Sequence, residues 1–139
     1  MSRVTLNQAR AILFTVFVFG LVAQFLALVS VQAEMRPGEL QALTLQLLGS
    51  YGVHLGVMIA GVFAQEGSKT RRVAMLPFWI AMTLALLWNL LLGWFTYAFI
   101  TSNSSVTLLA EQITAVSQAS SFLVAGALTY FFAKDHTVT

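Results

Sequence analysis

The chain has 139 residues, of which 58% are hydrophobic and only 9% are charged. A soluble domain usually carries about 25% charged residues, so this composition predicts a protein whose main solvent is lipid. Seven Lys and Arg residues face five Asp and Glu residues, and the basic residues stand mostly at the ends of apolar segments, a pattern that does not predict nucleic-acid binding. The chain has no cysteine, which excludes thiol catalysis, disulfide exchange and Cys-ligated metals.

The first apolar segment covers about residues 10–33. Arg3 and Arg10, the apolar run and the small residue Ala33 before Glu34 resemble a secretory signal. However, the apolar run from Ala11 to Val31 is longer than the roughly 7–15 residues of a signal core, and it is long enough to cross a bilayer. We therefore expect a transmembrane helix here.

Three further apolar segments follow, at about 40–65, 74–100 and 108–133. A spanning helix needs roughly 20 apolar residues, so four spans use almost the whole chain. Pro37 and Gly38 stand in the order that a type II turn requires, which predicts a tight hairpin between the first two spans. The sequence predicts an all-α membrane protein: a single domain of residues 1–139 with four transmembrane helices and short loops. No internal repeat suggests an inverted-repeat transporter.

The basic residues predict the orientation of these spans. One side of the membrane would receive six of them, and the other side would receive Arg36 alone; the six are Arg3, Arg10, Lys69, Arg71, Arg72 and Lys134. Short cytoplasmic loops are enriched in Lys and Arg, so both termini and the middle loop are predicted to be cytoplasmic. The expected location is the bacterial inner (plasma) membrane.

Each span carries one strongly polar residue near its centre, and the four are Gln24, His54, Asn89 and Gln118. Such groups either hydrogen-bond between helices and fix their register, or line a pathway or a small-ligand site. No acidic or basic side chain lies in the middle of a span, which argues against a proton-coupled antiporter.

His54 is the titratable side chain expected deepest in the membrane. An imidazole can act as a pH switch or bind a metal or haem. A single histidine per chain cannot ligate haem from both faces, and the second one, His136, belongs to the tail. The sequence therefore predicts a histidine buried among the helices, with no cofactor and no metal.

Small residues recur at four-residue intervals on two spans. This spacing lets helix backbones approach closely and predicts packing faces. On the second span the stripe is Gly52, Gly56, Ala60 and Ala64, and on the third it is Ala81, Ala85, Asn89 and Gly93.

The last span carries a continuous polar seam. Its members recur at alternating four- and three-residue steps and are Thr107, Glu111, Thr114, Gln118, Ser121 and Ala125. A repeat of 3.5 residues is typical of a left-handed helix crossing. The seam therefore predicts either a well-buried helix or the lining of a water-filled lumen made by several subunits. Glu111 would then form a carboxylate ring at the outer mouth that favours cations, or it is simply solvated near the helix N-terminus.

Three functions are compatible with these features. The first is a homo-oligomeric pore or channel for ions, with the last span as its lining. The second is a non-catalytic membrane anchor or assembly subunit that binds a larger protein partner. The third is a small-solute transporter that uses the polar layer as its binding site. An enzyme is not expected, because no nucleophile–base pair or metal-ligand cluster can be assembled.

The basic loop residues Lys69, Arg71 and Arg72 are a candidate cytoplasmic contact. They could bind anionic lipid headgroups or an acidic partner surface, or serve as a topology signal alone. The expected partners are thus the lipid bilayer, further copies of the chain and a possible cytoplasmic or membrane protein.

Overall fold

The computed structural model describes residues 5–63, 73–102 and 104–132. The first helix, α1 (Leu6–Ser30), begins four residues before the predicted position. A capping box explains the earlier start: the Thr5 hydroxyl accepts a hydrogen bond from the backbone N–H of Gln8, and the Gln8 side chain accepts one from the backbone N–H of Thr5. These bonds satisfy backbone donors that a helix start otherwise leaves unpaired.

The connection between the first two helices contains the predicted tight turn. A short 3₁₀ helix, η1 (Gln32–Glu34), follows α1. Gly38 then adopts φ +89°, a left-handed conformation that side chains disfavour. The backbone N–H of Glu39 donates to the carbonyl of Arg36 over 3.1 Å, which closes the turn around Pro37 and Gly38. The prediction made from Pro37 and Gly38 is confirmed.

Three long helices complete the fold: α2 (Glu39–Phe63), α3 (Met75–Ser102) and α4 (Val106–Phe132). Their starts, and the end of α3, lie within two residues of the predicted bounds. The predicted ends at residues 65 and 133 lie outside the described residues. The α4 helix starts two residues early because the Ser105 hydroxyl accepts a hydrogen bond of 3.2 Å from the backbone N–H of Leu108.

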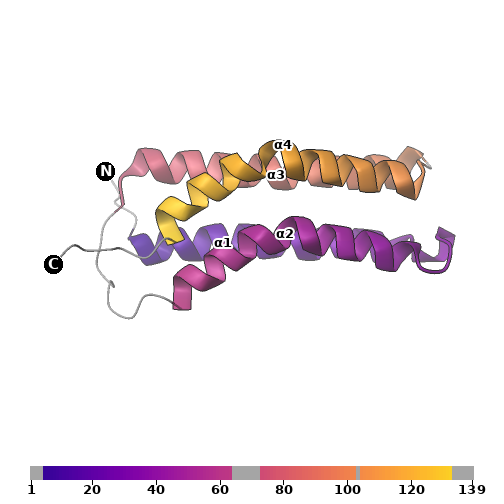
Figure 1. Cartoon of the computed structure of the whole chain (residues 1–139), viewed down its shortest axis with the longest axis horizontal. Helices are drawn as coiled ribbons and strands as arrows, with labels where there is room; N and C mark the ends of the chain where they lie inside the picture. Colours follow the sequence, from indigo (N-terminus) through magenta and orange to yellow (C-terminus); the bar gives the residue numbers. More distant parts are fainter. Residues whose placement is uncertain (1–4, 64–72, 103, 133–139) are drawn as a thin grey trace.

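The helices form two antiparallel hairpins that lie face to face (Figure 1). The α1 helix packs against α2 and α3, and α4 packs against the same two helices. One end of the bundle, called the terminal end below, holds Leu6, Phe63, Met75 and Phe132. The opposite end, called the turn end, holds Gly38 and the junction between α3 and α4 (Figure 1).

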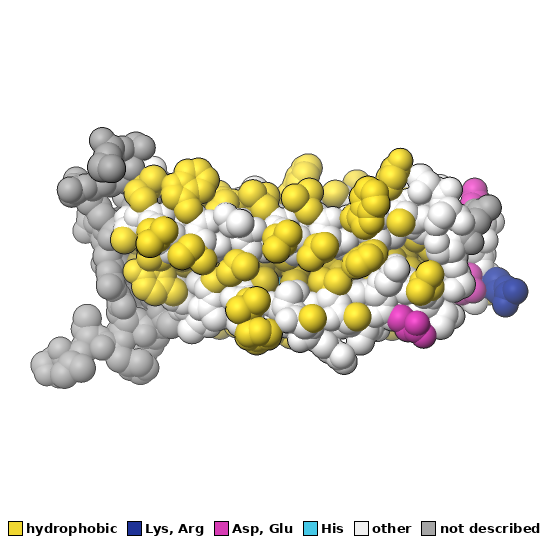
Figure 2. Space-filling model, turned by 90° about the horizontal axis from the view of Figure 1, so that it is seen from above, with side chains coloured by type: hydrophobic (Ala, Val, Ile, Leu, Met, Phe, Trp, Pro, Cys, Tyr) yellow, Lys and Arg dark blue, Asp and Glu magenta, His cyan; other side chains and the backbone are white. Residues whose placement is uncertain are grey.

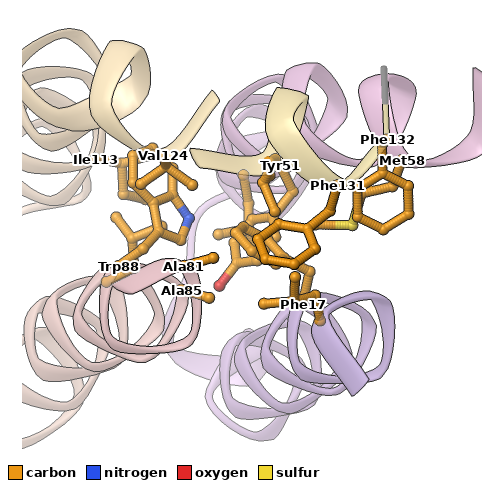
Figure 3. Packing of buried hydrophobic residues seen from close by; sticks show 14 of the residues in the cluster. Phe17, Tyr51, Met58, Ala81, Ala85, Trp88, Ile113, Val124, Phe131 and Phe132 are labelled. Carbon is orange, nitrogen blue, oxygen red and sulfur yellow. The ribbon is translucent and has the colours of Figure 1, made fainter. Parts of the chain in front are cut away.

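Large apolar side chains from all four helices meet along the bundle axis (Figure 3). Trp88 and Phe17 are almost completely enclosed, and Phe131 and Phe132 reach into this cluster from the end of α4. A few polar side chains are buried with them, namely Arg10, Gln24, Ser50, His54 and Thr96.

The outer surface is also apolar. Phe19, Leu76, Leu90 and Phe122 expose between 68% and 74% of their area. Figure 2 shows apolar side chains along the length of one face, with acidic and basic side chains gathered at one end. All four helices, of 25 to 28 residues each, are long and apolar enough to cross a membrane.

Candidate functional site

A chain of hydrogen bonds joins three helices near the middle of the bundle. The Gln24 side-chain N–H donates to the Tyr51 hydroxyl over 2.6 Å, and this hydroxyl donates to Oδ1 of Asn89 over 2.7 Å. The other end of the Asn89 amide donates to the carbonyl of Ala85 over 2.8 Å. The Thr96 hydroxyl lies 3.4 Å from Oε1 of Gln24. Two of the four predicted central residues, Gln24 and Asn89, are therefore joined through Tyr51.

Gly20 allows this network to form. A Cβ atom at this position of α1 would overlap the Asn89 side chain of α3 and would come within 3.2 Å of the Tyr51 hydroxyl. The missing side chain thus creates the space in which the Asn89 amide reaches Tyr51. The network depends on close approach of two helices at one glycine.

His54 lies one helical turn from Tyr51 and is completely buried. Its ring centroid is 4.6 Å from that of Trp88, with the planes at 86°, and 5.4 Å from that of Phe17. Neither imidazole nitrogen has a hydrogen-bond partner, and the same is true of Nε1 of Trp88. The perpendicular arrangement allows an N–H group to point at an aromatic face, which is a weak but favourable contact.

The polar seam of α4 lies at the edge of the bundle instead of at its centre. Glu111 and Gln118 are exposed, and Ser121 is half-buried. The half-buried Thr114 is bound to α2, because its hydroxyl accepts a hydrogen bond of 2.5 Å from the Gln46 side chain. The buried side of α4 is formed by Leu109, Ile113, Val124 and Leu128.

A groove of about 310 Å³, lined by both polar and apolar side chains, lies between α2 and α4, halfway along both helices. The seam residues Thr114, Gln118 and Ser121 line one wall, and Gln46 and Gly49 belong to the other. At its floor the Ser117 hydroxyl donates to the Ser50 hydroxyl over 2.8 Å. Three predicted site residues therefore share one surface feature, whereas Glu111 lies outside it.

The two stripes of small residues have different environments. Ala81 and Ala85 of α3 are buried within the bundle, and Gly93 is half-buried. Gly52, Gly56 and Ala60 of α2 are exposed, and a Cβ atom at either glycine would meet nothing within 4 Å. The three described members of the α2 stripe therefore lie on the side of α2 that points away from the other three helices.

Ala64 and the candidate cytoplasmic contact, Lys69, Arg71 and Arg72, lie outside the described residues. Within the parts of the chain that the structure describes, no three His, Cys, Asp or Glu side chains are grouped closely enough to hold a metal ion.

Comparison of the chain with protein-family models, with curated proteins and with solved structures found no match.

Sequence reasoning missed two residues that organise the interior. Tyr51 stands three positions before His54 on the same side of α2, which was a usable signal. Arg10, expected only as an orientation signal, is buried, and its Nε donates to the carbonyl of Phe131 over 2.6 Å. Its partner lies 121 positions away, so local sequence patterns could not reveal the contact.

Proposed function

We propose that the chain is an integral membrane protein that assembles from several copies into a pore, with the polar seam of α4 facing the lumen. The observation that carries this proposal is the position of Gln118. It lies at the middle of α4, within a span that is long enough to cross a bilayer, and its side chain is exposed on the outside of the bundle.

The free energy of polar groups in lipid supports this assembly. A single chain in a bilayer would present the Gln118 amide and the α2–α4 groove to hydrocarbon, where an unsatisfied polar group costs several kcal/mol. Association of copies around a water-filled lumen removes that cost, because water or a neighbouring subunit then supplies the hydrogen bonds.

The exposed glycines of α2 support close contact between subunits. Gly52 and Gly56 form a GxxxG pattern on the exposed side of α2, and both have open space in front of them. This pattern allows two membrane helices to approach closely. Subunits that pack through α2 would bring their α4 seams near one another.

The proposed orientation puts both termini in the cytoplasm of a bacterial cell, with the protein in the inner membrane. The turn end, which holds Glu34, Glu39 and the exposed Glu111, then faces outward. Carboxylates at the mouth of a pore favour cations, so a cation is the proposed permeant ion.

Two measurements on the purified protein test this function: the number of subunits in a nanodisc, and cation flux into liposomes. The proposal requires several subunits and measurable flux. Gln118→Leu should reduce the flux, whereas Thr15→Leu, at an exposed position of α1 away from the seam, should not. A monomer without flux would refute the pore.

The exposed groove also favours a second candidate, a membrane subunit that docks on a larger protein. Co-purification at native expression levels distinguishes the two candidates. A stable companion protein that is lost when Lys69, Arg71 and Arg72 are all replaced would support the docking subunit. The transporter receives less support, because Gln24 and Asn89 are already bound to Tyr51.

A further inference from the structure

The two halves of α4 are held in different ways. In the half near the turn end, the side chains of Thr114 and Ser117 are hydrogen-bonded to α2, through Gln46 and Ser50. In the half from Ser120 to Phe132, the hydroxyls of Ser120 and Thr129 donate to carbonyls of their own helix. Among the described residues of this second half, Phe131 is hydrogen-bonded to another helix, because its carbonyl accepts a bond from Arg10 of α1.

A bend separates these halves. The Ser117 hydroxyl shares its one proton between Ser50 and the carbonyl of Ile113, which lies 2.7 Å away, and the Ser120 hydroxyl donates to the carbonyl of Val116 over 2.6 Å. Such bonds to the residue four positions earlier tend to bend a helix. In Figure 1 the C-terminal part of α4 turns away from the line of α3 and descends toward α1.

Arg10 contacts the C-terminal end of α4. Its Nε donates to the Phe131 carbonyl over 2.6 Å, and its guanidinium carbon lies 5.8 Å from the centre of the Phe132 ring. The last four carbonyls of a helix have no partner within the helix, and the end carries partial negative charge. Within the described residues, a buried cation from α1 therefore binds the last turn of α4.

Gly61 of α2 contacts the same end from a second direction. A Cβ atom at Gly61 would overlap the backbone of Phe132. The backbones of α2 and α4 therefore touch there, and any side chain larger than hydrogen would push the end of α4 away. Three helices meet at the last turn of α4.

We propose that Arg10 and Gly61 form a latch that holds the terminal half of α4 against α1 and α2, and that this half pivots at Ser117 and Ser120 when the latch is released. Gln118 and Ser121 lie at the pivot and line the groove between α2 and α4. If the proposed pore function is correct, movement at the latch would change the part of the seam that lines the lumen. The latch itself does not depend on the pore.

Pulsed electron spin resonance distances in nanodiscs test the latch. The chain has no cysteine, so spin labels can be placed without removing native ones. The exposed pair Ala11→Cys and Thr129→Cys reports on α1 and α4 at the terminal end, and the exposed pair Leu26→Cys and Leu108→Cys reports on the turn end. Dilution with unlabelled protein removes distances between subunits.

Arg10→Leu should lengthen and broaden the distance at the terminal end and leave the turn-end distance unchanged. Gly61→Ala should have the same effect without removing the cation. Gly126→Ala is the control, because it makes the same substitution in the terminal half of α4 itself, where the space is open. It should change neither distance.

If both variants leave the terminal distance unchanged, the latch is refuted. If Arg10→Leu disturbs both distances, the variant has lost the fold and Gly61→Ala decides. A change at the terminal end alone supports the latch, and any other result for Gly61→Ala overturns it. Because the distances are measured independently of ion flux, the latch can be refuted while the proposed pore stands. The proposed pore can likewise be refuted while the latch stands.

Discussion

The Tyr51 hydroxyl donates a hydrogen bond of 2.7 Å to the side-chain oxygen of Asn89, and this bond joins α2 to α3 across the interior of the bundle. The Tyr51 hydroxyl also accepts a hydrogen bond from the Gln24 side chain, so that one phenol binds two amides from two other helices. The central polar layer is therefore organised by a residue type that is more often found at membrane interfaces.

Tyr51→Phe should destabilise the bundle by about 1–3 kcal/mol, because it leaves a buried donor of Gln24 and a half-buried acceptor of Asn89 unpaired. Unfolding in mixed micelles of increasing SDS fraction measures this change. Tyr130→Phe is the control: Tyr130 is 60% exposed, and its hydroxyl lies outside this network. Equal effects of the two substitutions would show that the Tyr51 hydroxyl contributes nothing to the interior.

His54→Leu, in contrast, should not lower the stability of the bundle. Both imidazole nitrogens lack hydrogen-bond partners in the bundle, so an apolar side chain of similar size loses no bond and removes two buried polar atoms. The same unfolding measurement should give unchanged or higher stability. A loss of more than about 1 kcal/mol would mean that the imidazole makes a hydrogen bond in the bilayer that this structure does not contain.

Gly20→Ala and Gly52→Ala should change stability in opposite directions. At Gly20 the added methyl group overlaps the Asn89 side chain, and overpacking of this kind typically costs about 1–3 kcal/mol. At Gly52 nothing lies within 4 Å, so the monomer should gain about 0.5–1 kcal/mol from the better helix former. If both substitutions destabilise the monomer, Gly52 does not face open space. If neither does, Gly20 is not packed tightly against Asn89.

The orientation can be tested with single cysteines, because the native chain has none. Ser105→Cys, near the turn end, should react with a membrane-impermeant maleimide added to intact cells. Ser68→Cys, in the middle loop that the sequence predicts, should react only after permeabilisation, since the basic residues of this segment favour the cytoplasm. The reversed pattern would invert the topology, and labelling of both positions in intact cells would contradict four spans.

The helices and the tight turn were predictable because they depend on local features. Each apolar run exceeds the length of a span, and Pro37 with Gly38 specifies a turn on its own. Which side of each helix faces the interior of the bundle was not predictable from local features. In a membrane protein the lipid side is as apolar as the interior, so hydrophobic periodicity does not distinguish them.

The α4 helix illustrates this limit. Leu109 and Ile113, which are not members of the seam, belong to its buried side, and Gln118 is exposed. The hydrogen-bond partner of Gln24 and Asn89 was equally unpredictable from the sequence, because their contact with Tyr51 depends on how three helices are positioned along the bundle axis. Sequence reasoning identified the polar residues but not which of them are satisfied within one chain.

The central claim is that the α4 seam faces a water-filled lumen, and cysteine accessibility along α4 tests it most directly. Single cysteines at Thr114, Gln118 and Ser121 would be compared with Phe122→Cys, whose native side chain is 68% exposed on the surface next to the seam. We expect a charged methanethiosulfonate reagent to block cation flux at the three seam positions and to leave flux unchanged at Phe122. Flux that persists after treatment at all three, or that is blocked equally at Phe122, would contradict the claim.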